Sequence, residues 1–337
     1  MNAAHSTPGW LAATHRRNVL KAAVLAISAP AVTTTLNACG GSSTAPNAAG
    51  SSAPDQVKAG VIAILDVAPI YLGKAQGFFA KHNIDLTMEQ AQGGAAIVPA
   101  VVSGQYQFGF SNIVSLLLAQ SQNVPIKAVA NGDNSTGDPA KDFGGIVVKD
   151  PAITTAKDLE GKTVATNTLK NIVDTSVKSV VSKAGGDPSK VKFVELGFPD
   201  MAAALDAGRV QAIFVVEPFL SAALAKGWRT VGSYADVDPN LCVAVYFTSN
   251  QLIAQKPDLA KRFTDAMSES LAYAQSHPDA VRQIITTYTT MKADQRAAMT
   301  LPKFAPTIDK ASVDKMNQLM VTYGLLTAPA DTGKLLP

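Results

Sequence analysis

The chain has 337 residues, of which 29 are Lys or Arg, 26 are Asp or Glu and two are Cys. Three basic residues, Arg16, Arg17 and Lys21, lie among the first 39 residues, which contain no Asp or Glu, so the rest of the chain carries 26 charges of each sign. This balance gives no argument for nucleic-acid binding. The roughly 280 residues that follow position 54 are enough for two domains or lobes.

The first 38 residues have the organisation of a secretory signal. A basic start is followed by the short apolar run VLKAAVLAISAPAV, residues 19–32, and then by small residues. The run is rich in Ala and Ser and is shorter than the about 20 apolar residues that a membrane span needs. We therefore expect residues 1–38 to be a cleaved signal peptide. The pair Arg16–Arg17 leaves both the twin-arginine and the general secretory route open.

The segment around Cys39 predicts a lipid anchor. The residues Leu36-Asn37-Ala38-Cys39-Gly40 resemble the lipobox of bacterial lipoproteins, in which the thiol receives a diacylglycerol and the chain is cut before the cysteine. Two or more acyl chains give stable anchoring to a membrane. The alternative is an ordinary cleaved signal with an incidental cysteine.

Residues 39–54 are predicted to form a flexible tether. After Cys39 the segment GGSSTAPNAAGSSAP contains no charged and no bulky apolar residue. Such a composition cannot bury enough surface to offset the entropy lost on ordering. With Cys39 acylated, Cys242 has no partner for an internal disulfide, so packing alone must hold the fold.

From residue 57 the chain alternates between apolar β-branched runs and segments with helical spacing. Strands are predicted over 57–65, 84–89, 106–112 and 125–132, with helices between them. A polar, Gly-rich loop follows over 132–145. A second series has predicted strands over 146–150, 162–166, 191–196 and 211–216, and another strand from 242. The alternation indicates parallel sheets with helices on both faces.

The two series predict an α/β fold of two lobes with a cleft between them. Residues 55–143 and 249–337 are assigned to lobe 1, and residues 144–248 to lobe 2. The remainder of lobe 1, over 257–325, has an almost wholly helical pattern. We expect two hinge crossings, near 144–148 and 243–248, because extended segments can absorb a closing motion while each lobe stays rigid.

Three segments resemble solute-binding proteins of the nitrate, sulfonate and taurine type. They are GKAQGFFAKHNIDL at 73–86, DLEGKTVAT at 158–166 and ALDAGRVQAIFVVEPF at 204–219. The resemblance implies a two-lobed type II periplasmic-binding-protein fold, in which each lobe is a mostly parallel sheet flanked by helices. It also implies delivery of a small molecule to an ABC permease and ATPase. Binders of thiamine pyrimidine precursors share the same signature, so the ligand stays open.

The candidate ligand site lies where the strands end, because open α/β sheets bind ligands outside the carboxyl ends of their strands. Three of these ends precede predicted helices, whose first N–H groups and dipole favour an anionic group. A sulfonate or carboxylate, with or without an aromatic ring, is the simplest ligand for such a site. The alternative is that the polar residues only cap their helices. The candidate residues are Asp66, Ala68, Gly93, Gly94, Ser111, Asn112, Asn167 and Thr168.

Two further candidates, Glu217 and Tyr246, come from later strands. Glu217 follows a buried strand, where an acid is costly unless it is paired or faces a cleft. Glu217 or Asp66 could bind an amino group, and Glu217 could instead pair with a basic residue across the hinge. Two acids in the cleft argue against a simple inorganic anion such as nitrate. Rings that could stack on a ligand are those of Tyr71, Phe198, Phe219 and Tyr246.

No sequence motif indicates an enzyme. The chain has no G-x-S-x-G, H-E-x-x-H, P-loop or G-x-G-x-x-G motif, and neither His82 nor His277 has a second His or Cys at metal-ligand spacing. We therefore expect no catalytic residue, cofactor or metal, and a monomer that faces the periplasm or the extracellular side. A pyrimidine synthase on the same fold class and a sensor that signals to a membrane partner are the alternatives.

Overall fold

The computed structural model describes residues 53–291 and 293–337, which all belong to one unit of the chain. The predicted signal peptide 1–38, the predicted lipidation site Cys39 and all but the end of the predicted tether lie outside the described residues. None of the helices in these described ranges is both long enough and apolar enough to cross a bilayer.

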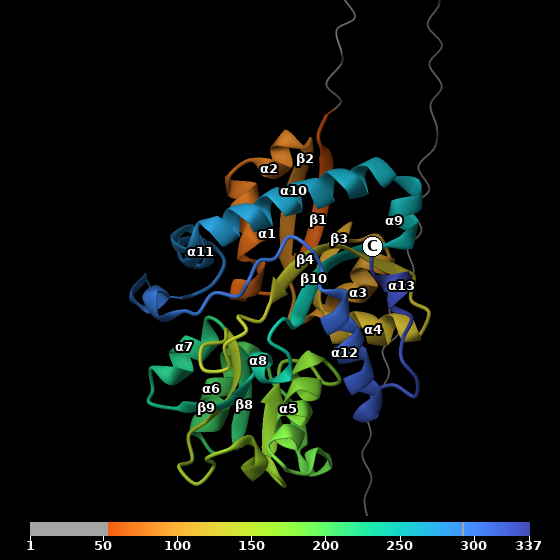
Figure 1. Cartoon of the computed structure of the whole chain (residues 1–337). Coiled ribbons are helices and arrows are strands. Elements are labelled where there is room, and N and C mark those ends of the chain that lie inside the picture. Colours follow the sequence, from red (N-terminus) through yellow and green to blue (C-terminus); the bar gives the residue numbers. More distant parts are fainter. Residues whose placement is uncertain (1–52, 292) are drawn as a thin grey trace, which may run out of the picture. The chain divides into compact units, whose positions relative to one another are not determined.

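Two five-stranded sheets organise the described part of the chain (Figure 1). The first sheet has the order β2-β1-β3-β10-β4. Strands β1 and β2 are parallel and pair from Asp55 with Ile84 to Val61 with Gln90, whereas β10 is antiparallel to both of its neighbours. All five residues of β3 are buried, as expected for a strand with helices on both faces. The strands are β1 (Asp55–Val61), β2 (Ile84–Gln90), β3 (Phe108–Asn112), β4 (Ile126–Asn134) and β10 (Cys242–Ser249).

The second sheet has the order β7-β6-β8-β5-β9 and again contains one antiparallel strand, β5. The predicted mostly parallel sheets are therefore confirmed. The edge strand β9 was not predicted, because its sequence RTVGS has a single apolar residue and only its last residue is buried. The strands are β5 (Gly144–Val148), β6 (Thr163–Thr166), β7 (Lys192–Glu195), β8 (Ala212–Val216) and β9 (Arg229–Ser233).

Helices flank both sheets. In the first lobe the long helix α10 packs on α1, and Gly73 makes this approach possible because a Cβ at that position would overlap the Ser270 side chain. The rings of Phe108 and Phe263 stack with their centroids 3.7 Å apart, and Phe79 packs beside Phe263. The helices of this lobe are α1 (Ala68–Ala75), α2 (Phe78–Lys81), α3 (Gly94–Val102), α4 (Ile113–Ser121), α9 (Asn250–Gln255), α10 (Pro257–Ser276), α11 (Pro278–Ile284), α12 (Lys310–Thr322) and α13 (Thr332–Leu335).

The second lobe has four helices among its described residues, and single 3-10 turns occur in both lobes. Before β6, Asp158 closes a turn by accepting hydrogen bonds from the backbone N–H groups of Thr155 (2.9 Å) and Thr154 (2.8 Å). The helices of this lobe are α5 (Ile172–Lys183), α6 (Phe198–Asp206), α7 (Phe219–Leu224) and α8 (Tyr234–Val237). The 3-10 turns are η1 (Leu65–Val67), η2 (Ala156–Leu159), η3 (Pro188–Lys190), η4 (Ile285–Thr287) and η5 (Ala293–Ala298).

The chain passes between the sheets twice, but the return lies earlier than predicted. It leaves the first sheet after Asn134, and it comes back between Val237 at the end of α8 and Cys242. Because β10 pairs with β3 and β4, residues 242–248 belong to the first sheet, and their expected place in lobe 2 was wrong. The mainly apolar run from Cys242 predicts a strand, and all eight residues of β10 are indeed buried. The run itself does not indicate which strands β10 pairs with.

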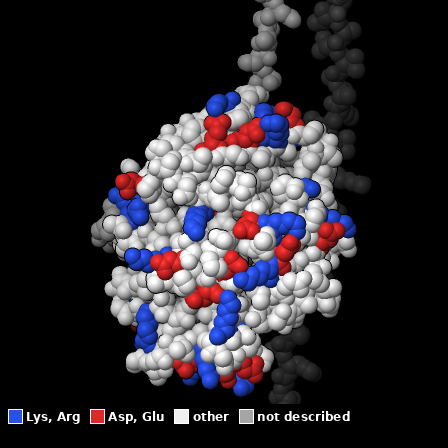
Figure 2. Space-filling view, in the orientation of Figure 1, with Lys and Arg blue, Asp and Glu red and all other residues white. Residues whose placement is uncertain are grey.

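The helical pattern predicted over 257–325 is interrupted. Between η5 and α12 the chain is extended near Lys303, which exchanges two backbone hydrogen bonds with Asn134 at 2.9 and 3.0 Å. Pro302 and Pro306 account for the interruption, because proline lacks the N–H group that a helix interior requires. On the face shown in Figure 2, basic and acidic side chains are interspersed, in agreement with the balanced charge of the sequence.

Candidate functional site

A small cavity lies where the carboxyl ends of strands from both sheets meet. It has a volume of about 30 Å³, which is room for about one or two water molecules. A larger solute therefore requires the two lobes to part or the lining side chains to move. The lining residues are Ile62, Ile64, Asp66, Phe110, Asn112, Val243 and Ala244 from the first lobe, and Asn167, Asn171, Ile172, Val173, Phe198, Val216 and Tyr234 from the second.

The lining is mainly apolar, with one acid and three amides. Asp66, Asn112 and Asn167 were predicted as site residues, and Phe198 was predicted as a stacking ring. Among the described residues that line the cavity there is no Lys, Arg or His. The site therefore offers hydrogen-bonding amides and an apolar wall, and its one ionisable carboxyl is negative when charged.

Hydrogen bonds and one close contact join the lobes beside the cavity. The Gln92 side chain donates to the Asn167 carbonyl at 3.2 Å, and the Asn167 side chain donates to the Gln92 carbonyl at 3.5 Å. Next to them, a Cβ at Gly93 would lie 2.7 Å from Cγ2 of Thr168. Any side chain at position 93 would therefore collide with Thr168. Glycine at this position lets the two lobes approach each other this closely.

Asn112 and Asn171 cap the helices that point at the cavity. The Asn112 side chain accepts from the Ser115 N–H at 2.9 Å, so the capping alternative describes Asn112 in this structure. Helix α5 begins at Ile172, and its cap is Asn171. Asn171 also donates to the Asn167 side-chain oxygen at 2.8 Å and to the Thr168 hydroxyl at 2.9 Å. Asn167 and Thr168 therefore belong to a turn before the helix and not to its first residues.

Three of the predicted residues support the site without lining it. Ala68 is buried in the first turn of α1. Gly94 is the first residue of α3, and a Cβ there would overlap the hydroxyl of Ser111. Ser111 is itself buried and donates to the Asn112 carbonyl at 3.2 Å. Gly94 and Ser111 therefore allow α3 to pack against the end of β3, one residue behind the cavity wall.

Asp66 and Asp133 form a buried acidic pair at the cavity. Asp66 is 2% exposed and Asp133 is 0% exposed. Burial raises the pKa of Asp66 to about 7, and the charges of Glu217 and Asp142 act in the same direction. Burial, followed by the charge of Asp66, raises the pKa of Asp133 well above its usual range. The two carboxyl groups hydrogen-bond to each other when one of them is protonated. Apart from that bond, one oxygen of Asp66 and both oxygens of Asp133 have no hydrogen-bond partner among the described residues.

Buried tyrosines surround this pair. Burial raises the pKa of Tyr234, Tyr246 and Tyr288, and the nearby carboxyl groups raise each of them further. Tyr234 lines the cavity, and the Tyr288 hydroxyl donates to the Ile64 carbonyl at 3.2 Å. The predicted site residue Tyr246 does not line the cavity, since its ring packs edge-on against Phe110 with centroids 5.2 Å apart.

Glu217 bridges the lobes with both its backbone and its side chain. Its side chain accepts from the Ser221 hydroxyl at 2.7 Å and from the backbone N–H of Thr300, which belongs to the first lobe, at 3.1 Å. Its carbonyl accepts from the Leu65 N–H at 2.9 Å. Burial raises the pKa of Glu217. Glu217 does not line the cavity, and its bond across the lobes is to a backbone N–H and not to a basic side chain.

Sequence reasoning missed most of the apolar lining. Ile62 and Ile64 fall inside the predicted strand 57–65, but β1 ends at Val61, so the strand end was predicted too late to mark them. Tyr234 follows the unpredicted strand β9, and Asn171 lies farther from the end of strand β6 than the predicted residues Asn167 and Thr168. Phe110 and Val243 fall inside predicted strands, where nothing in the local sequence separates a cavity wall from a core position.

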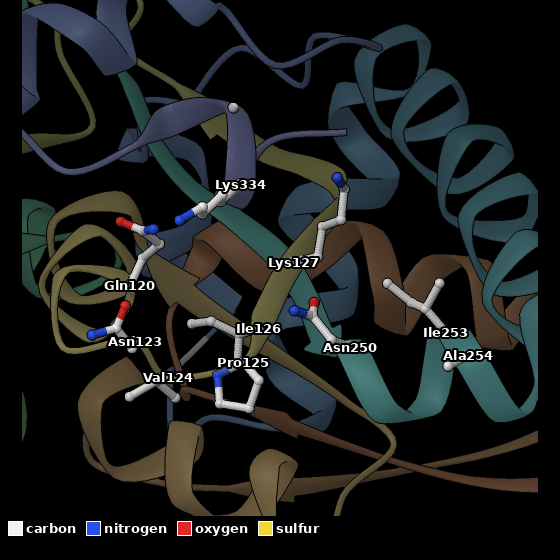
Figure 3. A pocket seen from close by; sticks show the side chains of 11 residues that line it. Gln120, Asn123, Val124, Pro125, Ile126, Lys127, Asn250, Ile253, Ala254 and Lys334 are labelled. Atoms are coloured by element: carbon white, nitrogen blue, oxygen red, sulfur yellow. The ribbon is translucent and has the colours of Figure 1, made fainter.

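A larger hollow, of about 580 Å³, lies elsewhere on the first lobe (Figure 3). It is lined at the start of β4 by Ile126 and Lys127, after β10 by Asn250, and near the end of the chain by Lys334. This is the edge of the sheet opposite to the carboxyl ends of β1 and β3, because β10 runs antiparallel to β3. Ligands of open α/β sheets bind at the carboxyl ends, so we place the candidate site at the cavity between the lobes.

The described residues contain neither a reactive cysteine nor a cluster of metal ligands. Cys242 is buried and unpaired, and burial raises the pKa of its thiol. Over 53–291 and 293–337 no three His, Cys, Asp or Glu side chains are grouped as a metal site requires.

Comparison with known proteins agrees with the fold. The family described as NMT1/THI5-like matches residues 65–281. The taurine-binding periplasmic protein of Escherichia coli is 26% identical over 63% of this chain and 64% of its own length. The 4-amino-5-hydroxymethyl-2-methylpyrimidine phosphate synthase of Candida albicans is 20% identical over 70% of each chain.

Solved structures share the architecture. The periplasmic nitrate-binding protein NrtA from Synechocystis PCC 6803 has a TM-score of 0.73 and 15% identity, over 84% of this chain and 86% of that one. The predicted resemblance to nitrate, sulfonate and taurine binders and to pyrimidine-related proteins is thereby confirmed. The family match covers more than half of the residues, from η1 into α11. The chain therefore belongs to the NMT1/THI5-like family and has the two-lobed α/β fold of periplasmic binding proteins.

Proposed function

We propose that this protein is an extracytoplasmic solute-binding lipoprotein, which holds a small organic solute between its lobes and delivers it to an ABC importer. The observation that carries the proposal is the cavity itself. It is lined from the strand ends of both sheets and is closed by contacts between the lobes. A site made of two lobes is exposed when they part and buried when they meet, as a receptor that captures and releases a solute requires.

The hydrogen bonds between the lobes define the closed form. The Gln92–Asn167 pair lies on one side of the cavity, and the bonds of Glu217 to Leu65 and Thr300 lie near the crossing. A solute favours closure only by the difference between its affinities for the closed and the open form. Contacts from both walls supply that difference, because the open form offers the solute one wall at a time.

The ligand we propose has an apolar body and a polar group. Phe198 and Tyr234 provide aromatic surface, and Asn112, Asn167 and Asn171 provide amides. A sulfonate or carboxylate would be held by these amides, with no basic side chain in the described lining to neutralise it. A thiamine pyrimidine precursor is the second candidate. The rings and the acid at the cavity favour it, and so does the relative from Candida albicans, whose name refers to a pyrimidine phosphate.

The cell location of the protein is part of the proposal. The relative from Escherichia coli is named a periplasmic protein, and residues 1–38 have the sequence of an exported signal. We propose that Cys39 carries the lipid anchor and that residues 40–54 let the monomeric binding unit reach a permease. An enzyme on this fold would convert a bound compound, whereas a receptor returns it unchanged.

The experiment is a search for a ligand with the mature protein. A thermal-shift screen of sulfonates, aromatic acids, nitrate and pyrimidines is followed by mass spectrometry of the compound released from the heated complex. We expect one class to raise the unfolding temperature and to be recovered unchanged. Recovery of a converted product would indicate an enzyme, and no response to any class would contradict the proposed ligands.

A matched pair of variants locates the binding. Phe198→Ala removes a ring from the cavity wall, whereas Phe193→Ala removes a ring from β7, outside the cavity. We expect only Phe198→Ala to lower the affinity for the compound found in the screen. Equal losses in both variants would show that the compound does not bind between the lobes.

A further inference from the structure

We propose that the two lobes close with the uptake of a proton by the buried carboxyl pair Asp66–Asp133, so that acidity favours the closed form whichever solute it holds. This inference rests on the closing motion of the proposed function and makes no claim about the solute. The observations that carry it are the hydrogen bond within the pair, the place of Asp66 in the surface that closes, and the acidic groups that meet there.

Asp66 and Asp133 act as one proton-binding unit. Their side chains hydrogen-bond to each other, and two carboxyl groups can do so only when at least one of them carries a proton. Asp133 lies on β4 inside the first sheet and is fully buried, so it holds that proton whether the lobes are closed or apart. Two carboxyl groups that share a site lose their protons in separate steps. The proton on Asp66 is therefore the one that the pair can exchange.

Asp66 lies in the surface that the lobes bury when they meet. It belongs to η1 and lines the cavity together with Val216 and Tyr234 of the second lobe. The residue before it, Leu65, donates its N–H to the carbonyl of Glu217 in the second lobe at 2.9 Å. When the lobes part, this bond breaks and water reaches the Asp66 carboxyl group, which is buried in this structure.

Acidic groups from outside the first lobe act on Asp66 in the closed form. Glu217 comes from the end of β8 and Asp142 from the first crossing, and the charge of each disfavours the ionised form of Asp66. Both groups have donors of their own, since Glu217 accepts from the Ser221 hydroxyl at 2.7 Å and Asp142 accepts from the Ser135 hydroxyl at 2.9 Å. Closure thus adds repulsion to the loss of water, and both oppose a charge on Asp66.

The remaining titratable groups around the pair supply no positive charge. Burial raises the pKa of each of them, so all are neutral near pH 7. No Lys, Arg or His belongs to the described lining of the cavity. These groups are Tyr71 from α1, Tyr234 from α8, Cys242 and Tyr246 from β10, and Tyr288 from the segment after η4.

The sign of the effect follows from the burial of Asp66. Burial raises the pKa of Asp66 to about 7 in the closed form, whereas in the open form a hydrated carboxyl group loses its proton at a lower pH. The closed form therefore binds the proton more tightly. This stabilisation of the closed form is fully present below the pKa of the open form and is lost as pH rises through about 7. Within that window one proton changes the ratio of closed to open molecules by up to about ten-fold per pH unit.

Distances between paired spin labels measure the closure and need no ligand. The labels are attached to the mature protein through Ser103→Cys, just after α3, and Ala203→Cys on α6, which are both exposed positions. The labelled protein is measured at pH 5 and pH 8, with and without Gly93→Val, which weakens the closed form. We expect the ratio of closed to open molecules to be ten-fold or more higher at pH 5. The same ratio at both pH values in both proteins overturns the inference.

Two variants tie the pH response to Asp66. Asp66→Asn introduces an amide of nearly the same shape that cannot titrate, so we expect it to remain closed at pH 8 and to lose most of the response. Asp174→Asn is the control and should keep the full response. Burial raises the pKa of Asp174 to about 6, but Asp174 lies on α5 outside the cavity lining. An undiminished response in Asp66→Asn, with its fold checked by circular dichroism, overturns the inference.

The outcomes separate this inference from the proposed function. If a solute from the ligand screen binds between the lobes while closure is the same at pH 5 and pH 8, then the proposed function stands and this inference fails. If closure follows pH as expected but no class in the screen binds, the proposed ligands fail and this inference stands.

Discussion

Replacing Asp66 by Asn is expected to make the protein more stable at neutral pH but not at acidic pH. Burial raises the pKa of Asp66 to about 7 in the folded protein, against about 3.9 in an unfolded chain. The folded state therefore binds the proton more tightly. Below about pH 4 both states are protonated and the charge has no cost. As pH rises from there through 7, the folded state must lose a proton that it holds strongly, and stability falls.

The size of the effect follows from the difference in pKa. A shift of about 3 units at 1.36 kcal/mol each gives a loss of about 4 kcal/mol in the free energy of unfolding between about pH 4 and pH 8. This is an upper limit, because the hydrogen bond between Asp66 and Asp133 ties the titrations of the two carboxyl groups together. Asn at position 66 does not titrate. The free energy of unfolding of Asp66→Asn should therefore exceed that of the wild-type protein by an amount that grows by about 2–4 kcal/mol between about pH 4 and pH 8.

Urea unfolding across this pH range measures the difference directly. Subtracting the two curves cancels the titrating groups that do not interact with Asp66, whereas any change in the titration of Asp133 remains in the difference. Asp158→Asn is the control, since hydrogen bonds from the backbone N–H groups of Thr155 and Thr154 lower the pKa of Asp158. The ionised Asp158 stabilises the folded state, and this stabilisation is lost only as pH falls below about 4. The difference in the free energy of unfolding between Asp158→Asn and the wild-type protein should therefore be constant from about pH 5 upward. A flat curve for Asp66→Asn as well would refute the burial argument.

Three other predictions test separate parts of the structure. Gly93→Val places a side chain against Thr168, because even a Cβ at position 93 would lie 2.7 Å from Cγ2 of Thr168. We expect the lobes to be held apart, which gives a larger radius of gyration in X-ray scattering and weaker solute binding. An unchanged radius of gyration would contradict the close approach of the lobes. Phe263→Ala removes the ring stacked on Phe108 at 3.7 Å and should lower the free energy of unfolding by about 3–5 kcal/mol in urea titrations. Cys39→Ser should release the protein from the detergent phase in a phase-separation assay; retention in that phase would rule out the lipid anchor.

The fold could be predicted to the extent that it is set by short-range patterns. Strands such as residues 84–89 are marked by neighbouring residues alone, and the helix that follows Asn112 begins where its cap predicted. The pairing of β10 depends on residues more than a hundred positions away, and the run 242–249 contains no information about them. That is why its lobe was assigned wrongly although its strand was predicted.

The site was predictable in its position but not in its chemistry. Strand ends led to Asp66, Asn112 and Asn167, which do line the cavity. The electrostatics of Asp66 depend on Asp133, because the two buried carboxyl groups hydrogen-bond to each other. In the sequence Asp133 falls at the edge of a polar loop, and its complete burial becomes visible only when β10 is placed beside β4.

The position of β10 between β3 and β4 also sets the order in which the two sheets can be completed during synthesis. When residue 237 has been synthesised, all five strands of the second sheet are present, but β3 and β4 still have no strand between them. Domains generally fold as they are synthesised. Here the first sheet starts with β1 but receives its last strand, β10, only after all strands of the second sheet have been synthesised. A nascent chain that stops before Cys242 leaves the edges of β3 and β4 exposed, which makes this interval of synthesis the one in which a holding chaperone matters most.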